Sequence, residues 1–295
     1  MAGLAAASLG AKDSRTYRRT PGLLAWLVML PLLAWLVLFI VVPTLMLVVV
    51  SFADRDALGR VVYQFSFDNY ARAFNWIWLR VLLQSVGYAL VTTLICMALG
   101  YPAAYFIGRA PVRWRAILLM LVMVPFWTSF LIRTYAWITI LSKEGLINGL
   151  LVGSGLFAEP VTLLYTPFAV ILGLVYNFLP FMILPIYTSV EKLDGAMIEA
   201  AYDLGAGPTR AFSQVIIPLT SPGITAGALL VFIPSIAMFA ITSLMGGGAD
   251  PNIGEVIYKQ FTAGRNQPFG AALGVLLLLI FVAALWLTQR MREED

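Results

Sequence analysis

Several features on which other protein classes depend are missing from this chain of 295 residues. It has no histidine, so no imidazole can act as a general base, a metal ligand or a proton relay. Its single cysteine, Cys96, excludes a disulfide framework within the chain and a cysteine-based metal site. Only 12% of the residues are charged, whereas an ordinary soluble domain has about 25%. We therefore expect no catalytic site, no metal site and no soluble fold.

Apolar residues, in contrast, make up 61% of the chain, and the mean hydropathy is +0.89. Six apolar windows are each long enough for the roughly 20 residues that a spanning helix needs. The predicted spans are 23–50, 81–108, 116–141, 160–190, 222–244 and 269–288. The sequence predicts an all-α, polytopic membrane protein with six transmembrane helices, a membrane domain at 23–288 and tails at 1–22 and 289–295.

Basic residues outside the spans indicate how the chain is oriented. Both tails, the turn at 109–115 and the loop at 191–214 carry more Lys and Arg than the opposite loops. Because loops rich in Lys and Arg stay in the cytoplasm, we expect both termini and the 191–214 loop to be cytoplasmic. A signal peptide is the alternative for the N-terminus, but the first apolar run is too long for one and no small-residue cleavage site closes it.

The 191–214 loop is a polar segment between two long apolar windows. Asp194 is a suitable N-cap, Gly205 and Gly207 tolerate the left-handed conformations that end helices, and Pro208 suits the first turn of a new helix. We therefore predict a helix, a tight turn and a second short helix. The residues at helical spacing on one face of the first helix are Met197, Ala201 and Leu204.

This loop has the chemistry of a docking element. Small Ala200 and Ala201 would let the backbone of another protein approach closely, and Glu199 offers an acceptor for a Lys or Arg of that protein. A capped loop that only connects two membrane helices explains the same pattern. The residues alone leave both interpretations open.

The same loop resembles the EAA loop of permease subunits of binding-protein-dependent ABC importers. The matching positions are Glu199, Ala200, Ala201, Gly205 and Pro218, and the departures, conservative in size, are Val215 and Ile217. The resemblance implies a type I ABC importer permease fold, in which this loop is a coupling helix that fits a groove on an ATPase subunit. The residues expected to take part in coupling are Glu199, Ala200, Ala201, Asp203, Gly205, Gly207 and Arg210.

A second resemblance concerns the third window. Its Ile-Arg-Thr-Tyr-Ala-Trp string at 132–137 and the Gly-Leu-Ile-Asn at 145–148 are similar to the first permease subunit of spermidine/putrescine importers and their relatives for opines and phosphonates. The family implies a bacterial inner membrane protein that works with a cytoplasmic ATPase dimer, a second homologous permease and an external solute-binding protein. ATP and Mg²⁺ would then bind the ATPase and not this chain, which contacts lipid and no nucleic acid.

Arg133 is the one charged residue inside the third window. Counted along a straight helix from Ala116, it lies near the outer membrane boundary, where a guanidinium can reach water. A role in gating or in the substrate path is the other interpretation, although an Arg on that path would repel a polycation. Both interpretations stay open.

No Asp or Glu lies within a predicted span, so a cation on the path would have to contact aromatic faces and carbonyl groups. The candidates for the translocation path are Trp127, Arg133, Tyr135, Trp137, Tyr176 and Asn177, with Phe178 beside them. Packing between helices explains membrane aromatic residues equally well. The glycine-rich segment at 246–248 lacks the Gly-Lys-Ser/Thr ending of a phosphate-binding loop, so we expect no nucleotide site.

These observations favour a transport subunit over an enzyme. A secondary transporter or channel would need membrane carboxylates, an inverted repeat or a filter, and the sequence has no clear one. We therefore expect the permease subunit of an ATP-driven importer of a small organic solute, with a polyamine as the first candidate and an opine or phosphonate as alternatives.

Overall fold

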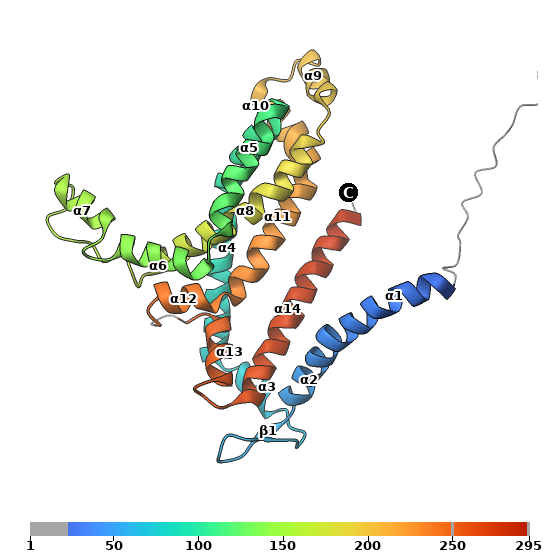
Figure 1. Ribbon diagram of the computed structural model, residues 1–295, viewed down its shortest axis with the longest axis vertical. Helices are drawn as coiled ribbons and strands as arrows, with labels where there is room; N and C mark the ends of the chain where they lie inside the picture. The colour runs from blue at the N-terminus through green and yellow to red at the C-terminus, as the bar shows by residue number, and fades with distance from the viewer. Residues whose placement is uncertain (1–22, 249–250, 294–295) are drawn as a thin grey trace, which may run out of the picture. The chain divides into compact units, whose positions relative to one another are not determined.

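The computed structural model describes residues 23–248 and 251–293, and most of them are helical (Figure 1). By internal contacts the chain divides into two units, Met1–Met46 and Leu47–Asp295. The first described elements are α1 (Leu23–Leu36), η1 (Val37–Val41) and α2 (Val42–Ser51). They follow one another directly and form an apolar helix of spanning length, which confirms the first predicted span.

The π-helical turn η1 has a local cause in the sequence. Pro43 has no amide hydrogen, and in an α-helix its ring would collide with the carbonyl group of Phe39. The wider π-turn that includes Phe39 relieves this conflict. Pro218 follows a second π-turn, η3 (Phe212–Ile216), at the same spacing.

The second unit is also built from helices, apart from one antiparallel hairpin in which Asp54 is opposite Val62. Its elements are β1 (Asp54–Arg55), β2 (Val61–Val62), α3 (Asp68–Ala73), α4 (Trp76–Arg109), α5 (Val112–Met123), η2 (Val124–Trp127), α6 (Phe130–Leu141), α7 (Leu146–Gly153), α8 (Pro167–Glu191), α9 (Gly195–Asp203), α10 (Pro208–Ala211), η3, α11 (Ile217–Ala237), α12 (Phe239–Met245), α13 (Ile253–Phe261) and α14 (Gln267–Glu293).

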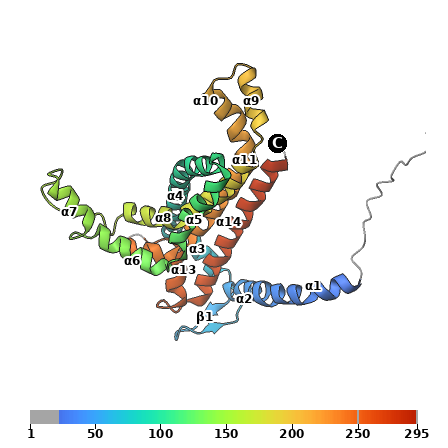
Figure 2. The ribbon, with the colours of Figure 1, turned by 45° about the horizontal axis from the view of Figure 1, so that its top comes forward.

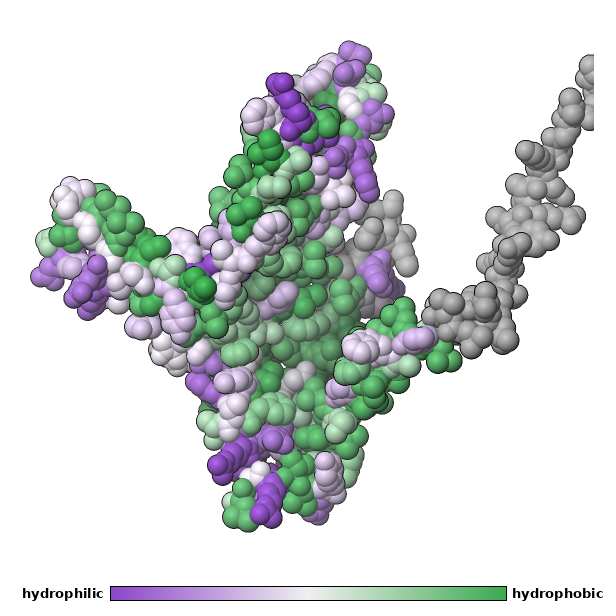
Figure 3. Space-filling view, viewed as in Figure 1, coloured by the Kyte–Doolittle hydropathy of each residue, from purple (hydrophilic) through white to green (hydrophobic). Residues whose placement is uncertain are grey.

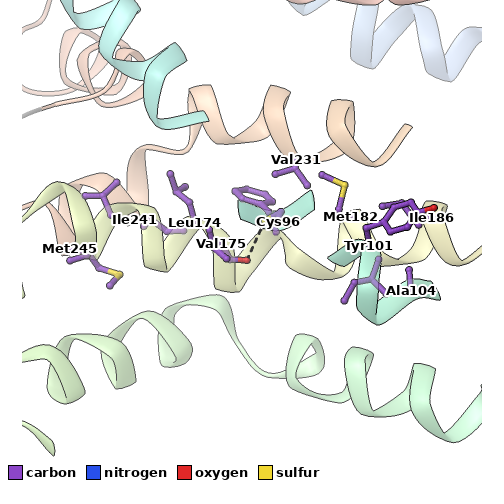
Figure 4. Packing of buried hydrophobic residues seen from close by; sticks show 14 of the residues in the cluster. Cys96, Tyr101, Ala104, Leu174, Val175, Met182, Ile186, Val231, Ile241 and Met245 are labelled. Carbon is purple, nitrogen blue, oxygen red and sulfur yellow. Dashed lines mark hydrogen bonds between the residues drawn. The ribbon is translucent and has the colours of Figure 1, made fainter. Parts of the chain in front are cut away.

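Helices α4, α8 and α11 pack side by side and form the centre of this unit. Buried apolar side chains fill the space between them, and the Cys96 thiol donates a hydrogen bond of 3.8 Å to the carbonyl oxygen of Val175 (Figure 4). Glycines allow the close approach, because a Cβ atom on Gly227 would lie 3.1 Å from the carbonyl oxygen of Met182. The helices on both sides of the α8–α11 connection are therefore tightly packed.

Hydrophilic residues gather at the end of this unit that carries α9 and α10, at the end that carries β1, and on the arm that carries α7 (Figure 3). Apolar side chains cover the helices between these ends. Figure 2 shows α9 and α10 projecting beyond the ends of α8 and α11. We call these ends the α9 end and the β1 end.

The third predicted span is not one straight helix. Val112–Trp127 and Phe130–Gly153 are bent by 86° relative to each other, with extended backbone at Thr128 and Ser129. Pro125 starts a 3₁₀ turn there, and the Thr128 hydroxyl donates a hydrogen bond of 2.7 Å to the Pro125 carbonyl oxygen. The described residues thus contain five helices of spanning length, or six if this bent pair is one span.

Two other predicted spans have wrong boundaries. The fourth begins at Pro167 and not at 160, because Thr166 caps α8 by accepting a hydrogen bond of 3.3 Å from the amide of Ala169. The fifth, predicted as one helix over 222–244, starts earlier and breaks at Met238 between α11 and α12. The Asn252 side chain stabilises that break by donating hydrogen bonds to the carbonyl oxygens of Ile236 and Met238, at 3.4 and 2.9 Å.

Candidate functional site

The loop between α8 and α11 has the predicted helix, turn and second short helix. The Asp194 carboxylate caps α9 by accepting a hydrogen bond of 3.0 Å from the Ala196 amide. At the other end, the Ala206 amide donates to the Ala201 carbonyl oxygen while Gly205 adopts a left-handed φ of +82°. This is a Schellman C-cap, which glycine adopts without strain.

Two details of the prediction for this loop are wrong. The first is Gly207, which has a φ of −71° and is extended instead of left-handed, because the residue before a proline favours extended backbone. The second is the accessibility of Ala201, which was expected to let the backbone of a partner approach closely. Ala201 is buried, whereas Met197 and Leu204 are exposed, Leu204 at 89%.

The exposed side of α9 is suited to a partner protein. Met197, Tyr202 and Leu204 leave large apolar side chains in contact with water at a hydrophilic end of the unit, which is typical of interaction surfaces. Ala200 and Glu199 are exposed beside them, whereas the buried Ala201 packs within its own chain and cannot contact a partner. Of the remaining coupling candidates, exposed Asp203 and Arg210 form no ion pair with the residues that the structure describes.

The α9 loop is connected to the packed helices next to it. Arg115, in the first turns of α5, donates a hydrogen bond of 2.8 Å to the Ala110 carbonyl oxygen. Its guanidinium lies 3.5 Å from the carboxylate of Glu191, the last residue of α8. The start of α5 and the end of α8 therefore meet where the chain leaves for α9.

The second candidate site is an aromatic cluster around Arg133. Its guanidinium lies over the rings of Phe126 and Tyr176, 5.0 and 6.0 Å from their centroids. The Trp137 ring packs against Tyr176 at 5.6 Å and Phe181 against Phe126 at 5.1 Å. Arg133 Nε is buried and has no hydrogen-bond partner in the described part of the chain. Ring faces are therefore the main contacts of this cation.

The bend of 86° before α6 changes the basis for placing Arg133. The count from Ala116 assumed one straight helix, which the structure does not have. The guanidinium packs over rings from η2 and α8 while Arg133 stays partly exposed, so its extension to water at a membrane boundary stays a prediction.

The structure brings together only some of the predicted path residues. Trp137 and Tyr176 join Arg133, whereas Trp127 and Tyr135 are 77% and 56% exposed. Asn177 is buried in the three-helix centre, where its amide donates a hydrogen bond of 2.8 Å to the Gly173 carbonyl oxygen. Phe126 and Phe181 were not among the predicted path residues, and their contact with each other joins η2 to α8.

A buried carboxylate was also not predicted from the sequence. Glu255, in the first turn of α13, is 2% exposed and pairs through Oε1 with Lys259 Nζ at 2.8 Å. Asn252 caps the helix by accepting a hydrogen bond of 2.8 Å from the Glu255 amide. The sequence signals were the N-cap and the i, i+4 Glu–Lys pair, which are also typical of exposed helices. No group of three or more metal-ligating side chains occurs in the described ranges.

Helices of spanning length, a tightly packed three-helix centre and a short capped helix exposed at one hydrophilic end define a polytopic helical membrane protein. Residues 97–293 match the family described as binding-protein-dependent transport system inner membrane component. The chain belongs to this family. It is the permease component of an ABC importer, a transport subunit of the inner membrane and not an enzyme.

Individual relatives agree with this assignment. The chain is 46% identical over 236 residues to the spermidine/putrescine transport system permease protein PotB of Salmonella typhimurium strain SL1344, covering 80% of this chain and 82% of that protein. It is 42% identical over 243 residues to PotB of Haemophilus influenzae, covering 81% and 85%. A bacterial alginate ABC transporter, solved with an alginate pentasaccharide-bound periplasmic protein, has the same fold, with a TM-score of 0.73, 19% identity and coverage of 91% and 94%.

Proposed function

We propose that this permease imports an aliphatic polyamine of the spermidine/putrescine type. The observation that carries the proposal is the 46% identity to a permease of that name over 80% of the chain. Opines and phosphonates remain the alternatives, and they differ from polyamines in carrying acidic groups. The solute is therefore distinguishable by its charge.

The aromatic cluster around Arg133 is not the basis of this proposal. Phe126 and Tyr176 already contact the guanidinium, which keeps its positive charge and would repel a polycation. Trp137 and Phe181 pack on these two rings. The polyamine proposal therefore rests on the sequence identity to the permeases of that name.

The energy for import comes, in this proposal, from a partner. A cytoplasmic ATPase dimer, which binds ATP and Mg²⁺, docks on the exposed side of α9, and this chain itself binds no cofactor. Closure of the dimer moves α8 and α11, because both flank the α9 loop and pack closely on α4. A second homologous permease completes the path, and an external binding protein delivers the solute. The α9 end and both termini then face the cytoplasm.

The test is uptake in proteoliposomes that contain the complex purified from its native host. We expect ATP-dependent uptake of labelled spermidine or putrescine, and we expect mass spectrometry to identify an ATPase and a second permease in the complex. Uptake of an opine or phosphonate, without competition by polyamines, would replace the proposed solute. Solute movement without ATP by the chain alone would contradict the whole proposal.

Glu199→Ala tests the docking surface. If Glu199 pairs with a cation in the ATPase groove, its loss costs about 2–5 kcal/mol of docking free energy, so transport and substrate-stimulated ATP hydrolysis fall at least tenfold. Glu144→Ala is the matched control, since Glu144 is an exposed acid between α6 and α7, far along the chain from α9. Equal activity of the two variants would show that Glu199 does not contribute to coupling.

A further inference from the structure

Glu255 is in an unusual position for a carboxylate. It is 2% exposed, and its Oε2 atom has no hydrogen-bond partner among the described residues. Only Oε1 is paired, with the Lys259 ammonium group. A carboxylate removed from water is strongly destabilised unless both oxygens accept hydrogen bonds or face cations. Glu255 is therefore a strong and incompletely satisfied acceptor for a cation.

The partner of Glu255 is far less fixed than Glu255 itself. The Lys259 side chain is 50% exposed, so its ammonium can leave Oε1 for water by rotation of its flexible stem. Glu255 is on the first turn of α13, which Asn252 attaches to the α11–α12 break. The amide of Ile253 also donates a hydrogen bond of 2.7 Å to the Ser85 hydroxyl of α4. A buried carboxylate on an anchored helix turn is thus paired with a half-exposed lysine.

An aromatic pair is on the same side of α13. Tyr258 follows Glu255 by three residues, so the two side chains share a helix face. The Tyr258 ring stacks on Phe239 with a centroid distance of 4.6 Å and an interplanar angle of 10°. Both rings are partly exposed. Carboxylates and accessible ring faces together recognise organic ammonium groups with an alkyl chain, and the i, i+3 spacing places both kinds of group on this side of α13.

We propose that Glu255 forms an ammonium-binding site in which the Lys259 ammonium is a resident counter-ion, replaced during transport by a primary ammonium group of the solute. The ammonium of the solute donates to Glu255 while its alkyl chain contacts the ring pair of Phe239 and Tyr258. Lys259 moves into water at the same time, so the buried carboxylate is always paired. The exchange of Lys259 for the solute during transport rests on the proposed import of a polyamine.

The direct test removes the Lys259 side chain by mutation and adds a free amine in solution. In the purified complex, Lys259→Ala removes the resident ammonium, and n-butylammonium has the four carbons and the charged group of a whole lysine side chain, one carbon more than the variant lacks. We expect Lys259→Ala to lower the unfolding temperature, and n-butylammonium to restore it in a saturable manner, as a ligand of the folded state does. Absence of any restoration would overturn the site.

Two controls make the restoration specific. Butyltrimethylammonium has the same charge but no N–H donor, so it should not restore the variant. In the Glu255→Gln/Lys259→Ala double variant, n-butylammonium should also have no effect, because the neutral amide does not attract a cation. Restoration in either control would reduce the effect to non-specific binding and contradict the proposal.

Lys259→Arg tests the exchange without removing the counter-ion. A guanidinium can pair with both carboxylate oxygens, so it should leave Glu255 more slowly than an ammonium does. We expect a stable complex with at least a fivefold lower rate of polyamine uptake, whereas Lys143→Arg, at an exposed site outside α13, should transport normally. Unchanged uptake in Lys259→Arg would argue against exchange.

The two proposals can fail separately. Restoration by n-butylammonium together with uptake of an opine or phosphonate would keep the ammonium site and refute polyamine import. Polyamine uptake by the wild-type complex without restoration in Lys259→Ala would keep the proposed function and refute the site.

Discussion

The close packing of α8 and α11 gives a quantitative prediction for Gly223→Ala. A Cβ atom at Gly223 would lie 2.6 Å from the Pro185 carbonyl oxygen and would also collide with the Ser189 hydroxyl. An ordinary contact needs about 3.4 Å, so the two helices would have to separate by about 0.8 Å at this level. Backbone atoms cannot rotate away as a flexible side chain does.

The expected cost follows from two opposing terms. Overpacking of this kind costs about 1–3 kcal/mol, whereas alanine in place of glycine within a helix gains about 1 kcal/mol. Gly87→Ala isolates the second term, because Gly87 lies within α4 with no atom near the added Cβ. The difference between the two variants is then about 1–3 kcal/mol, which corresponds to about 2–12 °C in unfolding temperature at about 2–4 °C per kcal/mol.

The assay is thermal unfolding of both purified variants in detergent, followed by uptake in proteoliposomes. We expect the unfolding temperature of Gly87→Ala to match or exceed that of the wild type. We expect Gly223→Ala to unfold several degrees below Gly87→Ala. We also expect slower uptake from Gly223→Ala, because α8 and α11 connect directly to the α9 loop. Equal unfolding temperatures for the two variants would refute the close approach of α8 and α11.

Two further predictions concern the candidate sites. Gly205→Ala places a side chain at a φ of +82°, which costs about 1–2 kcal/mol and disturbs the end of α9, so substrate-stimulated ATP hydrolysis by the assembled complex should fall. Gly195→Ala, at the start of α9 where an added Cβ meets no atom and φ is not left-handed, is its control, and the complex that contains it should hydrolyse ATP normally. Tyr176→Leu removes one ring from the Arg133 guanidinium and should lower the unfolding temperature by about 1–4 °C, since a cation–π contact contributes about 0.5–1 kcal/mol. Tyr135→Leu, outside the cluster, should leave the unfolding temperature unchanged. An equal decrease in unfolding temperature in both variants would contradict a cation–π contribution.

The α9 loop could be predicted in detail because its interactions are local. The Asp194 cap and the Gly205 turn use partners at most five residues away, so residue types at short spacing were sufficient. The buried face of α9 was not predictable in the same way. It depends on the tertiary contacts of α9, which favour Ile198 and Ala201 over Met197.

The breaks in the third and fifth spans depend on tertiary contacts and not on local ones. Proline in a long apolar window indicates a possible bend, but α8 contains Pro180 and Pro185 and still forms one helix. What stabilises the break at Met238 is the side chain of Asn252, 14 residues further along the chain. A hydropathy window does not report which side chain satisfies the carbonyl groups that a bend releases.

The sequence by itself determined the membrane class, the helical fold and the form of the α9 loop. These follow from the average hydropathy of each segment and from capping between near neighbours, which depend on local composition alone. Only the tertiary structure decided where the spans bend, that Arg133 packs against rings, and that Glu255 is buried. Each of these depends on groups that are distant in the sequence. A carbonyl group, a cation or a carboxylate that is removed from water is stable only where the fold brings a partner to it.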